Sequence, residues 1–400
     1  MNTQHLVRRL VKATPSKIVF LILDGLGGFR GAGRQQSELE AARLPHLDAL
    51  AAASSCGLSD PIAPGITPGS GPSHLALFGY DPVEHDIGRG LLSALGVDFP
   101  LQPSDLAARM NYCTVRDGLV TDRRAGRVPT AECARLCRML AKVEIAGVEV
   151  FVQPEQEHRA ALILRGEGLD DHLTDSDPQV TCKAPLRVQA LEAQAERAAT
   201  IVNEFVRQAG MILKDERPAN MVLLRGFARY HPIPSMQELY RLNPACIAVY
   251  PMYKGVTRLI GMKVLETGPS LGEEVATLET HWQEHDFFYL HVKKTDSAGE
   301  DGNFDAKVAV LEEVDGLLGR ILGLRPEVLV ITGDHSTPSA LKGHSWHPVP
   351  VLMHGRWCWP DEVRSFTELA FSRGCLGRLR ATDIMPLALA SAEKLAKYGA

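Results

Sequence analysis

Four short apolar runs place the strongest constraint on how this chain can fold. They have the length and β-branched content of strands buried on both faces, and they cover Lys17–Leu23, Met221–Leu224, Phe287–Val292 and Val328–Thr332. Such strands are typical of a mainly parallel sheet that carries helices on both sides. The runs therefore predict an α/β fold in which one sheet is sandwiched by helices.

Three of these runs lead into polar residues that can bind metals or carry chemistry. Asp24 and Gly25 follow the first run, Thr295 and Asp296 lie just past the third, and Gly333–His335 follow the last. Ligands of open α/β sheets bind at the carboxyl ends of the strands. We therefore expect these residues to share one site although they are far apart in sequence.

The middle of the chain has a different pattern. Its strand-like pieces, Met110–Val115, Glu149–Val152 and Ala160–Leu164, are short and are separated by loops rich in arginine and aspartate. A chain of 400 residues also exceeds what one compact core usually holds. We predict a smaller α+β cap domain, residues 105–215, inserted into a discontinuous core of residues 1–104 and 216–400.

Two segments have the pattern of long helices. Leu186–Gly210 is rich in good helix formers and ends on a glycine, and Phe304–Leu324 has apolar residues at helical spacing. Helices between the strands agree with the α/β prediction.

Charge and hydropathy exclude several classes of protein. The net charge is −5, with 43 Lys and Arg against 48 Asp and Glu, so no basic face for nucleic acid is indicated. No apolar segment approaches the roughly 18 residues of a membrane span, and no signal peptide is apparent. We expect a cytoplasmic protein with no membrane or nucleic-acid partner. The eight cysteines form no C-x-x-C pair and fit small buried hydrophobic residues.

The segment Gly65–His74 combines small residues with one candidate nucleophile, Ser70. Its glycines let the backbone approach a phosphate, and a helix starting near Pro72 would direct N–H groups to an anion. Ser70 would then be a nucleophile activated by a metal. A glycine-rich loop with a helix-capping serine explains the segment equally well. Because Gly69 directly precedes Ser70, the G-x-S-x-G turn of α/β-hydrolases is not matched.

The segment Val330–Pro350 is the most specific single indication of a metal site. Asp334 and His335 stand at a strand end, and His344 and His347 follow closely. Mixed carboxylate and imidazole ligands suit manganese, zinc or cobalt. Asp24 would be a further hard ligand, although an Asp-Gly pair after a strand is more often only a turn.

A third polar segment is acidic, with Asp296, Glu300, Asp301 and Asp305 close together. The spacing does not match the calcium loop of an EF-hand, so a solvated loop is the simpler interpretation. His281–His285 matches the H-x-x-E-H zinc pattern, but no further ligand is apparent, and short matches of this kind are often accidental. Neither a dinucleotide-binding glycine motif nor a P-loop is present.

Taken together, these segments resemble the alkaline phosphatase superfamily and, within it, the archaeal-type 2,3-bisphosphoglycerate-independent phosphoglycerate mutases. The resemblance covers nearly the whole chain. It rests on the stretches LDGLGG, PGSGPSHLALFGYDP, GRG, DRRAGR, DSDP, MYKG, TDSAGEDGNF and GDHSTP followed by HSWHPVP. It implies an alkaline-phosphatase-like core with an inserted cap.

The resemblance implies two divalent metal ions and a set of ligands for each. One ion would be held by Asp24, Ser70, Asp334 and His335, and the other by Asp296, Glu300 and His344. His344 is chosen over His347 by its position relative to the Pro-Val-Pro that follows. Mn²⁺ is the expected metal, with Mg²⁺, Co²⁺ and Zn²⁺ as alternatives, and no 2,3-bisphosphoglycerate is required.

Position 300 departs from the family pattern. Related enzymes often have histidine there, whereas this chain has Glu300. Because oxygen replaces nitrogen, the metal preference would move toward harder ions such as Mg²⁺ or Mn²⁺.

The substrate implied by the resemblance is a small anion, phosphoglycerate, whose phosphate and carboxylate require several cations. The candidates are Arg89, Arg123, Arg124, Arg127, Arg159, Arg225 and Lys254. A solvated surface charge is the simpler interpretation of any one of them.

The implied reaction interconverts 3-phosphoglycerate and 2-phosphoglycerate through phosphoserine at Ser70, in glycolysis and gluconeogenesis. Closure of the cap would exclude water, since water would hydrolyse the intermediate. A metal-dependent phosphomonoesterase or phosphonate hydrolase on the same core is the alternative. An inactive relative that binds metabolites is the third possibility, and Glu300 is the one feature that favours it. The oligomeric state is left open.

Overall fold

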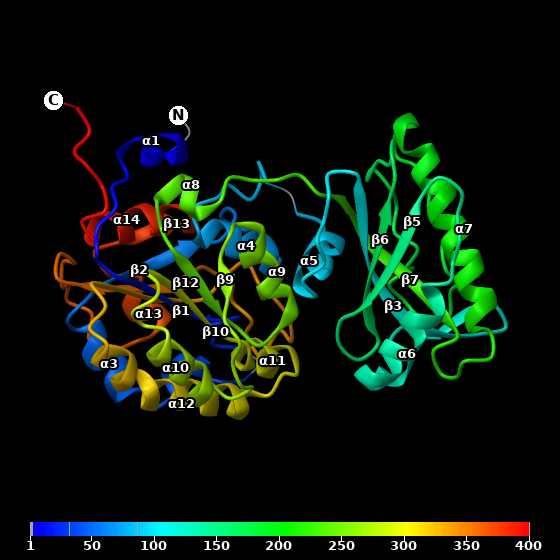
Figure 1. Ribbon diagram of the computed structural model, residues 1–400. Coiled ribbons are helices and arrows are strands. Elements are labelled where there is room, and N and C mark those ends of the chain that lie inside the picture. The colour runs from blue at the N-terminus through cyan, green and yellow to red at the C-terminus, as the bar shows by residue number, and fades with distance from the viewer. Residues whose placement is uncertain (1–2, 32, 86, 400) are drawn as a thin grey trace. The chain divides into compact units, whose positions relative to one another are not determined.

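The computed structural model describes residues 3–31, 33–85 and 87–399, which form two compact units. Unit 1 contains Met1–Asp86, Pro234–Tyr250 and Ile260–Ala400, and unit 2 contains Ile87–Ile233 and Pro251–Leu259. Figure 1 shows unit 1 as a sheet with helices on both faces and unit 2 as a sheet with a long helix against it.

Unit 1 is built on an eight-stranded sheet in the order β13-β2-β12-β11-β1-β10-β8-β9. Its strands are β1 (Ile18–Leu23), β2 (Ser55–Asp60), β8 (Pro244–Ile247), β9 (Lys263–Val264), β10 (Phe287–Val292), β11 (Val328–Thr332), β12 (Val349–Gly355) and β13 (Gly377–Arg380). Among the strand pairs of the described residues in this sheet, the two that involve β12 are antiparallel and the others are parallel. The predicted α/β fold with a mainly parallel sheet is confirmed.

Helices cover both faces of this sheet. They are α1 (Thr3–Leu10), α2 (Glu38–Ala41), α3 (Pro45–Ala51), α4 (Ser70–Leu77), α8 (Met236–Tyr240), α10 (Leu271–Thr280), α11 (Lys294–Glu300), α12 (Phe304–Gly323), α13 (Glu368–Phe371) and α14 (Ile384–Ser391). In Figure 1, α3, α10 and α12 lie on one side of the sheet, and α4 and α14 lie on the other. The helix predicted for Phe304–Leu324 is confirmed by α12.

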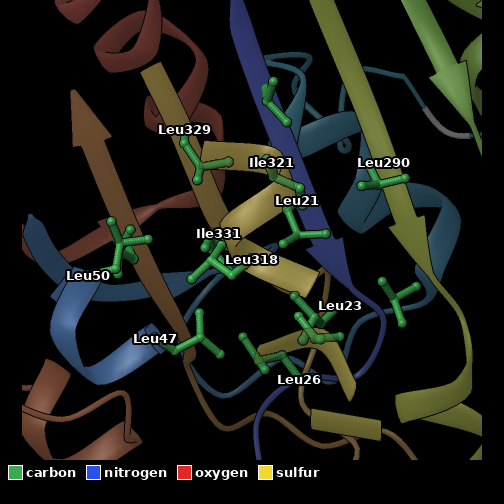
Figure 2. Packing of buried hydrophobic residues seen from close by; sticks show 14 of the residues in the cluster. Leu21, Leu23, Leu26, Leu47, Leu50, Leu290, Leu318, Ile321, Leu329 and Ile331 are labelled. Atoms are coloured by element: carbon green, nitrogen blue, oxygen red, sulfur yellow. The ribbon is translucent and has the colours of Figure 1, made fainter. Parts of the chain in front are cut away.

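The core of unit 1 explains why its central strands are apolar throughout. Leu21 and Leu23 of β1 face Leu318 and Ile321 of α12, as Figure 2 shows. The opposite face is apolar as well, since Phe20 contacts Phe287 with ring centroids 5.0 Å apart. Each strand therefore needs apolar side chains in both directions.

Unit 2 contains a five-stranded antiparallel sheet. Its elements are α5 (Arg89–Gly96), β3 (Asp105–Arg116), β4 (Leu119–Asp122), α6 (Thr130–Leu140), β5 (Glu149–Pro154), β6 (Arg159–Arg165), α7 (Glu196–Leu213), β7 (Met221–Arg229) and α9 (Pro251–Leu259). Side chains of α6 and α7 form a core with β3, β6 and β7. Ala94 of α5 packs with Ala107 and Ala161 in a separate cluster.

The strand at Met221–Leu224 was predicted for the large parallel sheet, and this prediction is wrong. The segment belongs to β7, which pairs antiparallel with β3 in unit 2. An apolar run shows that a strand is buried but not which strand it pairs with, and β7 is buried beneath α7. Unit 2 extends beyond the predicted limits 105–215, since it also includes α5, β7 and α9.

The helix predicted for Leu186–Gly210 is shifted in the structure. It begins at Glu196 and continues to Leu213. The residues before it are held in other ways, since the N–H of Leu186 donates to the carbonyl of Ser176 and that of Gln189 donates to Thr174 Oγ1. Among the described residues, no helix is long and apolar enough to cross a membrane.

A buried lysine supports the loops at the carboxyl ends of the central strands. Lys307 of α12 is fully buried, and its Nζ donates to the carbonyl oxygens of Gly25 (2.8 Å), Gly27 (3.1 Å) and Thr337 (2.9 Å). Glu38, also buried, provides a nearby negative charge. One ammonium group therefore ties the loop after β1 to the loop after β11.

Replacement of Lys307 is expected to destabilise unit 1 strongly. Lys307→Met leaves three carbonyl groups without their donor and a buried carboxylate without its counter-charge, which costs about 3 kcal/mol or more. Thermal and urea unfolding followed by circular dichroism measure the change. Lys263→Met, on the exposed strand β9, is the control and should unfold like the wild type. Equal stability of both variants would contradict this role for Lys307.

Candidate active site

The predicted polar residues meet at the carboxyl ends of three neighbouring strands. β1 lies between β10 and β11 and is parallel to both, with Leu23 opposite Val292 and Ile22 opposite Thr332. Asp24, Asp296 and Asp334 follow these three strands and are almost completely buried, each at most 1% exposed. The predicted convergence of these segments on one site is therefore present in the fold.

A first group of possible metal ligands contains Asp24, Asp334 and His335, whose ligand atoms all lie within 4.8 Å of one another. His335 Nε2 is 3.4 Å from Asp24 Oδ1 and 3.2 Å from Asp334 Oδ2. Ser70 Oγ lies 3.2 Å from the same nitrogen. The candidate nucleophile therefore adjoins the first group.

Ser70 occupies the first turn of α4, directly after Gly69, which has extended backbone torsion angles. The helix thus begins two residues before the predicted start at Pro72. His74, one turn later, has its Nδ1 2.8 Å from the carbonyl oxygen of Ser70. The N–H groups of this first turn can receive an anion beside Ser70.

The hydrogen bonds of His335 fix which of its nitrogens is free to bind a cation. Thr337 Oγ1 donates its hydrogen to Asp296 Oδ1 at 2.7 Å. The contact of 2.9 Å between Thr337 Oγ1 and His335 Nδ1 must therefore be donated by Nδ1–H. Burial lowers the pKa of His335 well below its usual range, so the ring is neutral. The lone pair of Nε2 consequently faces two carboxylates, an arrangement that suits a metal cation.

A second group contains Asp296, His335 and His344, again with all ligand atoms within 4.8 Å. His344 Nδ1 lies 2.9 Å from the carbonyl oxygen of Pro68, to which it can only donate. The lone pair of its Nε2 is then available and lies 3.7 Å from Asp296 Oδ1. The rings of His335 and His344 stack with centroids 3.6 Å apart.

Two other residues considered for metal binding lie farther out. Glu300 ends α11 with its side chain 56% exposed and its Oε1 4.0 Å from His344 Nε2. His347 instead bonds Ser345 Oγ through Nδ1 and contacts the ring of Phe29. Neither belongs to the groups found among the described residues.

The charges around the two carboxylates of the first group are unequal. Burial raises the pKa of Asp334 well above its usual range, and the charge of Asp24 adds to this effect. Burial acts the same way on Asp24, but Lys293 and His291 outweigh it and hold the pKa of Asp24 well below its usual range. Asp334 Oδ2 has no hydrogen-bond partner among the described residues. These donors fit a divalent cation, which would supply the missing positive charge.

Sequence reasoning missed several residues of this site. Lys293 Nζ donates to both Asp24 and Asp296. His291 Nε2 is 3.3 Å from Asp24 Oδ2, and burial lowers the pKa of both His291 and His74. The spacing of Lys293, three residues before Asp296 at the start of a helix, was a signal that could have identified it.

The pair in the H-x-x-E-H match does not form a zinc site. α10 ends at Thr280, so His281 and His285 do not share a helical face. Their Nδ1 atoms bond Glu284 and Asn243 respectively. Within the part of the chain that the structure describes, neither is in a group suited to a metal.

The predicted cations all lie in unit 2, and most of them are close together. Burial lowers the pKa of Arg89, and the positive charges of Arg225 and Arg109 lower it further. These three guanidinium groups are therefore neighbours. His158 is buried, and its pKa is lowered to about 4 by burial and then by four arginines. These four are Arg159, Arg124, Arg109 and Arg127. Like charges gathered in this way repel one another, and a bound anion would relieve the repulsion.

Two members of the predicted cation set are in different surroundings, and two residues were missed. Arg123 is engaged by Asp177 through two hydrogen bonds of 2.9 and 2.6 Å. Lys254 is half-buried on α9. Arg109 and His158 were not predicted, because one arginine in a strand and one histidine in a turn give no distinctive pattern.

Comparison with known proteins identifies the family. A model of the 2,3-bisphosphoglycerate-independent phosphoglycerate mutases matches residues 51–220. A protein of Thermus thermophilus named as a probable member is 50% identical, with 100% of both chains covered. This chain belongs to that family. A probable phosphoglycerate mutase of this type from Thermotoga maritima is 46% identical to it over the same full coverage.

Two solved structures are similar in fold to this phosphoglycerate mutase family member. A protein from Pyrococcus horikoshii has a TM-score of 0.84 and 29% identity, and it covers 97% of this chain and 100% of its own. A cofactor-independent phosphoglycerate mutase from Thermoplasma acidophilum has a TM-score of 0.71 and 30% identity, with 94% and 100% covered. The predicted family resemblance is confirmed.

Divalent metal should stabilise this phosphoglycerate mutase family member through the first ligand group. Mn²⁺ at about one hundred times its dissociation constant should stabilise the folded state by about 2.7 kcal/mol. The unfolding midpoint of the EDTA-treated protein, measured with and without Mn²⁺, tests this. Asp334→Asn should lose most of the increase, whereas Asp301→Asn, an exposed carboxylate nearby, should keep it. An undiminished increase in Asp334→Asn would contradict the assignment.

Proposed function

We propose that this chain interconverts 3-phosphoglycerate and 2-phosphoglycerate, without 2,3-bisphosphoglycerate, through a phosphoserine at Ser70. The observation that carries the proposal is the position of Ser70 Oγ, 3.2 Å from His335 Nε2 and beside buried carboxylates, in a chain of this family. The reaction is an isomerisation in which one phosphoryl group moves between the O3 and O2 atoms of glycerate.

Two sets of side chains would hold the divalent ions. Asp24, Ser70, Asp334 and His335 form the first set, and Asp296 and His344, with Glu300 from the rim, form the second. Mn²⁺ is the ion we propose, because carboxylate oxygens suit it and Glu300 adds a further oxygen to the second set. When bound, such ions favour the ionised form of the serine hydroxyl and neutralise charge on the transferred group.

Ser70 would form and release the covalent intermediate. Its Oγ bonds to phosphorus as the bond from phosphorus to O3 of the glycerate breaks, and the serine proton is transferred in effect to O3. The 2-hydroxyl of the retained glycerate then bonds to phosphorus, and Oγ leaves and regains a proton. The phosphoryl group returns to glycerate only if glycerate, and not water, accepts it from Ser70.

Unit 2 would supply recognition of the anionic substrate. Its arginines can bind phosphate and carboxylate groups bidentately, and three of them, Arg89, Arg109 and Arg225, are close neighbours. We propose that this cluster, together with the arginines around His158, binds the phosphoglycerate. Arg123 would act mainly by pairing with Asp177.

A metal-dependent phosphomonoesterase is the alternative activity on the same core. Both reactions use the same nucleophile and ligands and differ in whether water accepts the phosphoryl group. Family membership and the arginine cluster favour the mutase. The intact buried set around Ser70 speaks against an inactive binding protein.

Product analysis separates these activities. With Mn²⁺ and 3-phosphoglycerate, and without 2,3-bisphosphoglycerate, phosphorus NMR should show 2-phosphoglycerate, and Ser70→Ala should abolish its formation. Ser73→Ala, a buried serine on the same helix, is the matched control and should retain activity. Accumulation of free phosphate in its place would favour the hydrolase.

Loss of an arginine from the cluster should weaken substrate binding. Arg109→Met removes a charged contact of about 1.5 to 3 kcal/mol, so KM for 3-phosphoglycerate should rise about tenfold or more. Arg138→Met, exposed on α6, should leave KM unchanged. Steady-state kinetics measure both, and an unchanged KM in Arg109→Met would exclude Arg109 from substrate binding.

A further inference from the structure

Lys293 connects the two groups of possible metal ligands. Its Nζ donates to Asp24 Oδ2 at 3.0 Å and to Asp296 Oδ2 at 2.5 Å. Asp24 belongs to the first group and Asp296 to the second. One ammonium group therefore contacts a carboxylate of each group.

Each carboxylate gives Lys293 one oxygen and turns the other toward His335 or His344. Asp24 Oδ1 lies 3.4 Å from His335 Nε2. Asp296 Oδ1 lies 3.7 Å from His344 Nε2 and accepts the hydrogen bond from Thr337. The two Oδ2 atoms contact the ammonium group, and Asp24 Oδ2 also lies 3.3 Å from His291 Nε2. A metal ion beside the histidines could use Oδ1 of each aspartate without displacing Lys293.

The fold fixes Lys293 in this place. β10 ends at Val292, which pairs with Leu23, so the next residue after β10 lies beside Asp24. Lys293 precedes α11 and is three residues before Asp296, within one helical turn. Its side chain is 20% exposed, and its Nζ lies 5.7 Å from the ring centre of Tyr250. The ammonium group is thus held between Asp24, which follows β1, and Asp296, in the first turn of α11.

We propose that Lys293 is a positioning residue for the metal centre, which orients Asp24 and Asp296 so that Oδ1 of each faces its metal. The proposal rests on the metal-binding role of these aspartates under the proposed function. Groups that orient metal ligands without touching the metal typically change affinity by about 10- to 100-fold when they are removed. Lys293 contacts no reacting atom in this account.

The competing view is that Lys293 is only a counter-ion for buried carboxylates. In that case its positive charge opposes metal binding, and its removal would tighten binding rather than weaken it. The two views therefore predict opposite changes in affinity.

Mn²⁺ titration of the EDTA-treated full-length protein by calorimetry distinguishes the two views. Lys293→Met should bind Mn²⁺ at least about tenfold more weakly than the wild type. Lys293→Arg should recover most of the affinity, because a guanidinium group can also contact two carboxylates. Lys294→Met removes the next lysine, which is exposed, and should bind like the wild type. Lys293→Gln, with the same expected weakening, replaces Lys293→Met if the latter does not fold.

The possible failures have different meanings. Unchanged or tighter Mn²⁺ binding in Lys293→Met, with normal binding by the wild type, would overturn the positioning role and leave the proposed function intact. Absence of Mn²⁺ binding by the wild type would overturn the metal centre itself and the proposal with it. Weakening in Lys293→Met that Lys293→Arg reverses would support the proposal.

Discussion

Three buried carboxylates at the ends of neighbouring parallel strands set the main electrostatic constraint on the candidate active site. Asp24, Asp296 and Asp334 are withdrawn from water at one edge of the sheet, where their mutual repulsion is poorly screened. Lys293 compensates two of them. Burial and the charge of Asp24 raise the pKa of Asp334, which makes its ionised form costly, and a bound cation would stabilise that form.

The groups around these carboxylates are arranged in a way that suits the binding of a cation. His335 and His344 each give Nδ1–H to a fixed acceptor and direct the lone pair of Nε2 toward the carboxylates, an arrangement that suits metal ligands. Lys307 donates to carbonyl oxygens in the loops after β1 and β11 and so holds these two loops together. Unit 2 has the opposite character, with arginines gathered around His158. Negative charge suited to metals and positive charge suited to an anionic substrate are thus built into separate units.

The sequence predicts the parts of this arrangement that depend on local patterns. The runs ending at Leu23, Val292 and Thr332 are neighbouring strands in the structure. Such runs could be predicted, because a short apolar run indicates a buried strand, and a polar residue just after it indicates the sheet edge at which ligands bind. β7 was assigned to the wrong sheet because strand pairing is not local. Arg109 and His158 were missed for a related reason. Their surroundings are made by residues distant in sequence, so their residue type and spacing alone give little indication.

The account depends on Ser70 as the residue that carries the phosphoryl group. The direct test is acid quenching of the Mn²⁺-loaded protein during turnover of 3-phosphoglycerate, followed by proteolysis and mass spectrometry of the peptide that contains Ser70. The account predicts one phosphoryl group on Ser70, absent without substrate. A phosphoryl group on another residue, or an unmodified Ser70 when the quenching demonstrably traps the intermediate of a related mutase, would contradict it.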